Sequence, residues 1–226
     1  MNEFIDWSAY MGTYEPDTLK AIKILIKNGM IFVDVGANSG LYSSLASKIV
    51  GEKGKVYAFE PTSYGYKKLV DNLILNESKN IESFQIGLSD KKFSTEVGLA
   101  SSYPLKPINL QMIHPFHGGS IVKEKIKFMT LDSFDFRPDV VKIDTDGYEY
   151  KILKGTENTL RKNKPAIILE LIQKTLAEKG DSENALIDYL SLLGYSFFTL
   201  DFVPITNLKN RHRTNIIAMH NDRTTH

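Results

Sequence analysis

The chain has 226 residues, of which 42% are hydrophobic and 24% charged, a composition that suits one large folded domain and excludes disordered and fibrous classes. Its 28 Lys and Arg balance 27 Asp and Glu, so the net charge of +1 gives no general attraction to nucleic acid, which we do not expect as a partner. The absence of cysteine excludes disulfides, thiolate zinc sites and a cysteine nucleophile.

An amphipathic helix is the first predicted element, over residues of about 15–29. Leu19, Ile22 and Ile26 share one face of it. The residues before it lack the basic start and the apolar run of a secretory signal, and no apolar stretch approaches the ~18 residues of a membrane-spanning helix. These features predict a soluble, cytoplasmic protein without a transmembrane segment.

Short β-branched runs then alternate with amphipathic runs, which is typical of βαβ units around a mostly parallel sheet. The first five runs are mostly continuous in apolar residues, as expected for strands that are buried on both faces. The predicted strands are Met30–Val35, Lys55–Phe59, Glu82–Ile86, Asp139–Ile143, Ala166–Leu171, Ser196–Leu200 and Asn215–Met219. Apolar positions at helical spacing lie between them, within Leu41–Ile49, Tyr66–Leu73, Ile152–Leu160 and Leu186–Leu193.

The alternation is interrupted by residues 91–137, which contain Pro104, Pro107 and Pro115. This stretch is too long for an ordinary connection between a strand and a helix. Ile121–Leu131 near its end has a strand-like pattern. We predict a single domain over residues 1–226 with a functional insertion or lid on its substrate side.

The strongest local signal is the run Val33–Gly40, where a buried strand ends in a turn built around Gly36 and Gly40. Such a turn lets the backbone approach a ligand closely and directs the amides of a helix N-terminus at it. Ala37 and Asn38 stand where the dinucleotide fingerprint needs a second glycine, which argues against NAD. A tight turn without a ligand is the structural alternative.

Acidic residues follow the next two predicted strands. Glu60 ends the second strand, where an acid in doubly wound folds accepts hydrogen bonds from ribose hydroxyls, although it could also be a solvated acid. Ser89 and Asp90 follow the third strand, and Asp90 could receive an adenine amino group or cap the following turn. Because ligands of open α/β sheets bind outside the carboxyl ends of the strands, these tips should converge.

A third group of acids follows the fourth predicted strand, within Val140–Glu149. Clustered carboxylates repel, so a cation, a proton or a polar ligand usually offsets them. Asp144 is the functional candidate, whereas Asp146 or Glu149 could instead favour the next helix through its dipole. Glu170 in the fifth strand should lie at the strand tip next to Asp144, because burying it unpaired would be costly. Together Asp144 and Glu170 could bind Mg²⁺ or hold a substrate hydroxyl.

Two histidines, His114 and His117, lie in the insertion. A histidine near neutrality can take a proton from a hydroxyl, although loop histidines are often merely solvated. Their H-x-x-H spacing, with no cysteine and no second pair, does not predict a zinc site. The chain also lacks a nucleophile elbow and a P-loop, which removes the common hydrolase and nucleotide-hydrolysing classes.

Five blocks occur in a set order along the chain: Val33–Gly40, Phe59–Pro61, Leu88–Asp90, Thr130–Phe134 and Lys142–Glu149. Together they resemble the FkbM family of S-adenosylmethionine-dependent methyltransferases, over a region from about Phe32 to the final strand. The resemblance implies an α/β, Rossmann-like class I methyltransferase fold, with a seven-stranded, mostly parallel sheet whose last strand runs antiparallel. It also implies S-adenosylmethionine as cofactor, with the glycine turn on the methionine part, Glu60 on the ribose and Asp90 on the adenine. Asp146 departs from the family pattern, which has Glu there.

We therefore predict an O-methyltransferase that acts on a hydroxyl of a sugar, a glycan, a glycolipid or a polyketide-type small molecule. The alternatives are an N-methyltransferase for an amino sugar or a peptide, and a cofactor-binding module without methyl transfer. The oligomeric state stays open.

The predicted site has a cofactor part and a catalytic part, with Mg²⁺ as a possible second cofactor. The predicted cofactor-binding residues are Asp34, Gly36, Asn38, Gly40, Glu60, Ser89, Asp90 and Asp144. The predicted catalytic residues are Asp144 and Glu170, which hold the acceptor, and His117 or Asp146, which serves as the base.

Overall fold

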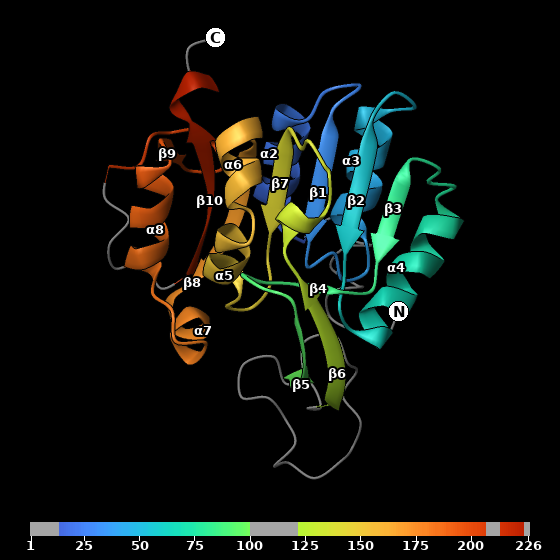
Figure 1. The fold of residues 1–226 in the computed structure, drawn as a ribbon. Coiled ribbons are helices and arrows are strands. Elements are labelled where there is room, and N and C mark those ends of the chain that lie inside the picture. Colours follow the sequence, from blue (N-terminus) through green and yellow to red (C-terminus); the bar gives the residue numbers. More distant parts are fainter. Residues whose placement is uncertain (1–13, 100–121, 207–212, 224–226) are drawn as a thin grey trace.

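The computed structural model describes residues 14–99, 122–206 and 213–223. A seven-stranded sheet crosses it in the order β3-β2-β1-β7-β8-β10-β9, with helices on both faces (Figure 1). β10 runs antiparallel to β8 and β9, and the other pairings are parallel. The strands are β1 (Ile31–Val35), β2 (Lys55–Phe59), β3 (Ile81–Phe84), β7 (Val140–Ile143), β8 (Ala166–Ile172), β9 (Tyr195–Phe198) and β10 (Arg213–His220). The predicted sheet with an antiparallel last strand is confirmed.

The sheet has a separate apolar core on each face, because neighbouring residues of a buried strand point to opposite sides. Phe32 packs with the residues of α2 and α3, whereas Val33 and Val35 pack with those of α5 to α8. The helices are α2 (Pro16–Leu25), α3 (Leu41–Val50), α4 (Ser63–Leu75), α5 (Glu149–Lys154), α6 (Glu157–Asn163), α7 (Gln173–Glu178) and α8 (Glu183–Leu192). In the described residues no helix is both long enough and apolar enough to cross a bilayer.

The helical prediction needs two corrections. α2 ends at Leu25 rather than near residue 29, and the pattern over Ile152–Leu160 forms two helices rather than one. The break falls at Gly155, where a Cβ atom would lie 2.0 Å from the carbonyl oxygen of Ser89. The backbone there passes so close to another loop that only glycine fits.

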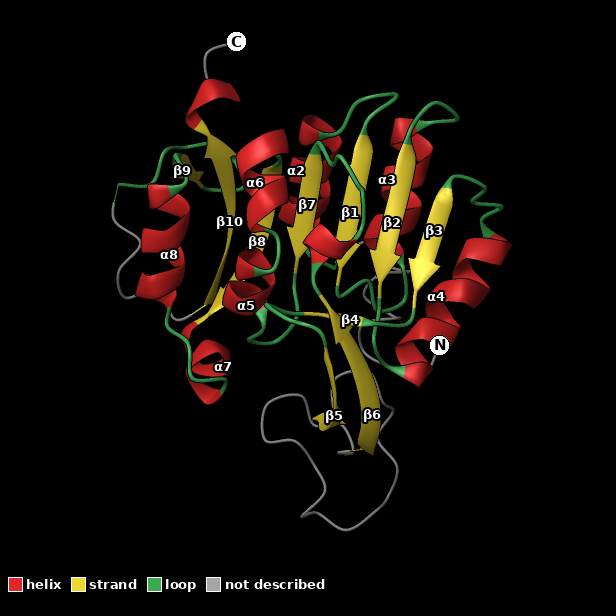
Figure 2. Ribbon diagram, in the orientation of Figure 1, coloured by secondary structure: helices red, strands yellow, loops and turns green. Residues whose placement is uncertain are grey.

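A second, three-stranded sheet lies at the carboxyl edge of the first, toward which the arrowheads of β1, β2 and β7 point (Figure 2). It consists of β4 (Gly87–Leu88), β6 (Val122–Met129) and β5 (Phe93–Leu99), in that order. β5 and β6 form a hairpin, and β4 pairs with β6 in parallel. Part of the predicted insertion is thus an ordered cover over the edge where a ligand is expected.

This second sheet corrects the prediction for the third strand. β3 ends at Phe84, and Gly87 and Leu88 have left it to pair with Phe128 and Met129 of β6. A Cβ atom at Gly87 would lie 2.5 Å from the Phe128 ring, so glycine allows the close approach. Ser89 and Asp90 therefore follow a strand of the second sheet rather than the tip of β3.

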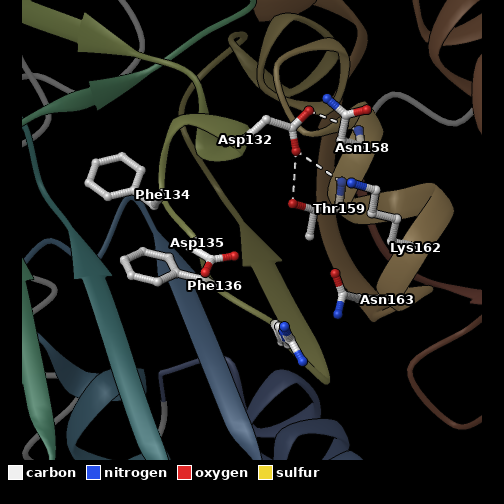
Figure 3. A pocket seen from close by; sticks show the side chains of 9 residues that line it. Asp132, Phe134, Asp135, Phe136, Asn158, Thr159, Lys162 and Asn163 are labelled. Atoms are coloured by element: carbon white, nitrogen blue, oxygen red, sulfur yellow. Dashed lines mark hydrogen bonds between the residues drawn. The ribbon is translucent and has the colours of Figure 1, made fainter.

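The segment after β6 begins with the short 3-10 helix η2 (Leu131–Ser133) and covers the first sheet with aromatic side chains. Phe134 and Phe136 stack with ring centroids 5.1 Å apart, and Phe136 also stacks on Tyr57 of β2 at 3.6 Å. Asp132 accepts hydrogen bonds from the N–H groups of Asn158 and Thr159 at the start of α6 and from the Thr159 hydroxyl (Figure 3). The Thr130–Phe134 block of the family pattern thus has a structural role.

A groove of about 370 Å³ separates this segment from α6. Its lining residues fall within 132–137 and 158–163, which precede β7 and β8 in the chain. None of the predicted site residues lines it. The groove therefore belongs to the amino-terminal side of these strands, away from the edge where ligands of such sheets bind.

Replacing Asp132 with alanine tests this structural role. We expect Asp132→Ala to lower the free energy of unfolding by roughly 1–3 kcal/mol, because three donors at the start of α6 lose their acceptor. Asp135→Ala, at an exposed neighbouring acid, should change it by less than about 0.5 kcal/mol. Urea unfolding of both variants measures the difference, and equal losses would contradict the assignment.

Candidate active site

The glycine turn after β1 joins the ends of three elements. The N–H groups of Gly36 and Ala37 donate to the carbonyl oxygen of Phe59, at 3.0 and 2.9 Å, which ties the turn to β2. Gly36 has a φ of 80°, and a Cβ atom there would lie 1.9 Å from the carbonyl oxygen of Asp144 after β7. Only glycine allows both the positive φ and this close approach, and it therefore lets the turn lie against β2 and β7.

Glu60 lies beneath this turn and is 4% exposed. One carboxylate oxygen accepts the N–H of Asn38 at 2.9 Å, and the other accepts the N–H and the hydroxyl of Thr62, at 3.0 and 2.6 Å. Burial raises the pKa of Glu60, against the lowering effect of these hydrogen bonds. Glu60 thus organises the turn, and its remaining lone pairs are what a bound hydroxyl would use.

An apolar slot opens between the two sheets. Phe128 forms one wall and stacks on Phe93 and Tyr148, with ring centroids 4.7 and 5.3 Å apart. Such walls suit a flat aromatic group. The lining residues are Val35, Gly36, Phe59, Pro61, Ile86, Gly87, Leu88, Ile126, Phe128, Thr145, Tyr148 and Ile152.

Ser89 and Asp90 follow directly after Leu88, which lines the slot. Ser89 is buried, and its hydroxyl donates to the Asp90 carboxylate at 3.1 Å. Asp90 is exposed. Ser89 and Asp90, predicted at the end of the third strand, therefore lie close to the slot, although they follow β4 of the second sheet.

Asp34 and Lys142 form a buried charged group beside the turn. Asp34 is 0% exposed and accepts a hydrogen bond from the Ser43 hydroxyl at 2.6 Å. The Lys142 ammonium lies 2.9 Å from one oxygen of Asp144 and 3.9 Å from Asp34, over the ring of Tyr42. Burial lowers the pKa of Lys142, but the two carboxylates outweigh it and hold that pKa above its usual value, so Lys142 stays charged. Asp34 reaches no surface, so any part it has in cofactor binding is support of the turn.

Asp144 and Glu170 come together as predicted, but Glu170 is not at a strand tip. Ile143 pairs with Leu169, which places the next two residues, Asp144 and Glu170, side by side. β8 continues to Ile172 because β10 pairs with it, and Asn215 of β10 stands opposite Glu170. Glu170 is therefore an interior strand residue with 7% exposure.

Tyr14 and Glu15, just before α2, lie near Asp144 and Glu170, and neither was predicted as a site residue. Glu15 accepts hydrogen bonds from the hydroxyls of Tyr42 and Thr18 and from the Asn215 amide, at 2.7, 3.1 and 3.3 Å. Burial raises the pKa of Tyr14, and the charges of Glu15, Asp144 and Glu170 raise it further, so its phenol stays protonated. No spacing or motif near residue 14 predicts that these two residues lie beside the acids of β7 and β8.

Glu149 holds the loop after β7 and is 2% exposed. One of its oxygens accepts the N–H groups of Thr145 and Gly147 and the Thr145 hydroxyl, at 3.0, 3.1 and 2.9 Å. Its other oxygen is buried and has no hydrogen-bond partner among the described residues. Burial raises the pKa of Glu149 to about 7, against the lowering effect of these bonds. Asp146 is half-buried in the same loop, with a φ of 52°.

His114 and His117 lie outside the described residues. Within the described ranges, no group of three or more His, Cys, Asp or Glu side chains is arranged to hold a metal ion. The Mg²⁺ hypothesis therefore lacks support. The positive charge next to Asp144 comes from the Lys142 ammonium.

A family model described as the methyltransferase FkbM domain matches residues 34–197. Among curated proteins, the chain is similar to the hexuronic acid methyltransferase AglP of Haloferax volcanii, with 26% identity over 150 residues. That match covers 65% of this chain and 58% of the relative, so the chain spans less than two thirds of the relative's length.

Two solved structures share the fold. Methyltransferase FkbM from Methylobacillus flagellatus KT has a TM-score of 0.55 and 15% identity, over 92% of this chain and 51% of that one. A SAM-dependent O-methyltransferase from Thermotoga maritima has a TM-score of 0.54 and 13% identity, over 92% and 65%. The fold is thus the Rossmann-like class I methyltransferase fold that the sequence predicts.

The raised pKa of Glu149 makes stability depend on pH. Its contribution is fully present below the usual pKa of 4.5 and is lost as the pH rises through about 7, because the folded state binds this proton more tightly. Glu149→Gln cannot ionise, so we expect it to gain about 3 kcal/mol relative to the parent between pH 4.5 and 8.

Urea unfolding at a series of pH values measures this gain. Glu178→Gln, at an exposed acid of α7, is the matched control and should follow the parent at every pH. A Glu149→Gln curve parallel to that of the parent would show that Glu149 does not titrate in this range.

Proposed function

This chain belongs to the FkbM methyltransferase family, and we propose that it transfers a methyl group from S-adenosylmethionine to a hydroxyl of a sugar, a hexuronic acid unit above all. The sugar class is supported by the name of the relative from Haloferax volcanii, a hexuronic acid methyltransferase. The choice of oxygen over nitrogen rests on the resemblance of the sequence blocks to a family that typically methylates hydroxyls.

The residues at the carboxyl edge fit S-adenosylmethionine. The slot walled by Phe128 suits the adenine ring, and Glu60 has lone pairs left for ribose hydroxyls. The side-chain oxygen of Asn38 is buried without a hydrogen-bond partner in the described chain, and an amino group of the methionine part would satisfy it. When bound, this cofactor supplies an electrophilic methyl group on a positively charged sulfonium.

The chain must then orient the acceptor and assist the loss of its proton, so positioning and general-base effects dominate. Asp144 and Glu170, side by side on β7 and β8, hold the acceptor hydroxyl in this proposal. The Lys142 ammonium, 2.9 Å from one Asp144 oxygen, holds this carboxylate in position. His117 or Asp146 takes the proton.

One observation carries the proposal: the cofactor turn and the acceptor acids share one edge. Gly36 lies so close to the Asp144 backbone that a Cβ atom would overlap the carbonyl oxygen. The Asp144 N–H also donates to the carbonyl oxygen of Val35 at 3.1 Å. This closeness of the turn to Asp144 supports a site in which a methyl group held at the turn would lie near the acceptor carboxylates.

Calorimetric titration tests the cofactor half. The parent should bind S-adenosylmethionine and S-adenosylhomocysteine with micromolar affinity, and Glu60→Ala should weaken both at least about tenfold, because ribose loses a charged partner. Glu82→Ala, at an exposed acid of β3, should bind like the parent. Circular dichroism confirms that both variants are folded, and a parent that binds neither ligand contradicts the proposal.

Transfer of a labelled methyl group tests the acceptor half. We expect the label to enter uronate oligosaccharides, with NMR placing the new methyl group on oxygen. Asp144→Asn should lower kcat about 100-fold. Label on an amino sugar or a peptide would favour the N-methyltransferase. Cofactor binding with no labelled product from any of these acceptors would favour a binding module, and full activity of Asp144→Asn would remove its assignment.

A further inference from the structure

The β5–β6 hairpin has two faces of opposite character. Lys123, Lys125 and Lys127 alternate along β6 and are exposed, whereas Ile126 and Phe128 are buried. Because successive side chains of a strand point to opposite faces, the lysines share the outer face, roughly 7 Å apart along the strand. The result is a straight row of ammonium groups over the cofactor edge, called the lysine row below.

The lysine row is only partly neutralised. Glu96 of β5 lies 3.5 Å from the Lys123 ammonium, with both side chains well exposed to solvent. Lys125 and Lys127 form no ion pair with any residue that the structure describes. Since the net charge of the whole chain is only +1, this excess of positive charge is local.

The lysine row also lies beside a strand edge that is partly open. β6 is the middle strand of the order β4-β6-β5, but β4 pairs only with its last residues, Phe128 and Met129. Along Lys123–Lys127 the described strands pair with β6 on the β5 side alone. Lysines at such an edge also prevent pairing with another chain, so the binding experiment below separates the two roles.

The inner face of the hairpin fixes the lysine row relative to the site. Glu124 accepts the N–H of Ser63 at the start of α4, at 3.0 and 3.1 Å from its two oxygens. Phe128 stacks on Tyr148, and Ile126 and Phe128 line the apolar slot. The same strand thus offers its apolar face to the slot and its cationic face to solvent.

We propose that the lysine row binds the acceptor itself, a linear polyanionic glycan with repeated carboxylates, while one of its sugar units enters the active site. This inference rests on the proposed function and adds the class of acceptor. Regularly spaced ammonium groups attract a chain of carboxylates, whereas a neutral glycan finds no partner for them. Because the lysines are exposed, the attraction is modest at each one and sensitive to salt.

Calorimetry with an oligogalacturonate, in the presence of saturating S-adenosylhomocysteine, tests the inference. The triple variant Lys123→Gln, Lys125→Gln and Lys127→Gln should bind this probe at least about fivefold more weakly than the parent at low salt. The difference should shrink as salt is added. The matched control replaces Lys23, Lys27 and Lys48, exposed lysines of α2 and its C-terminal flank and of α3, with glutamine and should bind like the parent.

Several outcomes would overturn the lysine row as the acceptor surface. They are a parent that does not bind the oligogalacturonate, a parent that binds a neutral maltooligosaccharide or a single-stranded RNA equally well, and equal weakening in the control variant. Binding of S-adenosylhomocysteine alone, measured for all three proteins, should be unchanged. Failure of the proposed function appears instead as loss of cofactor binding or of methyl transfer in the parent.

Discussion

A single buried ammonium group, that of Lys142, lets two carboxylates coexist where β1 and β7 end. Asp34 is wholly buried and Asp144 stands at the edge, and each lies within 4 Å of this cation. Removing one partner from such a buried group leaves an uncompensated charge, which is strongly destabilising. The contact with Lys142 that orients the Asp144 carboxylate therefore also stabilises the sheet.

A second carboxylate, that of Glu60, organises the glycine turn after β1. It binds backbone N–H groups of Asn38 and Thr62, which belong to the turns after β1 and β2. Glycine at position 36 lets the first turn lie against β7. The site thus depends on close backbone contacts between the ends of β1, β2 and β7. These contacts form a frame that fixes the position of the side chains that would touch a ligand.

Much of the frame could be predicted because its causes are local. Short β-branched runs, the first five of them mostly continuous in apolar residues, predicted the seven strands. The Gly36 turn and Glu60 followed from their positions at strand ends. The need for glycine at positions 155 and 87 could not be predicted, because each depends on a distant atom: the Ser89 carbonyl oxygen and the Phe128 ring. Lys142 opens one of the family blocks, but its contact with two carboxylates could not be predicted, because Asp34 lies on another strand.

The sequence by itself determined the fold class, the family and the strand ends that carry acids, because apolar periodicity and motif spacing are properties of the chain alone. Only the tertiary structure decided how those acids are buried and which other residues surround them. It placed Glu170 inside β8, brought Glu15 to Tyr42 and Asn215, and turned the apolar face of β6 toward the slot. These outcomes depend on strand register and on packing between distant segments, which no local pattern encodes.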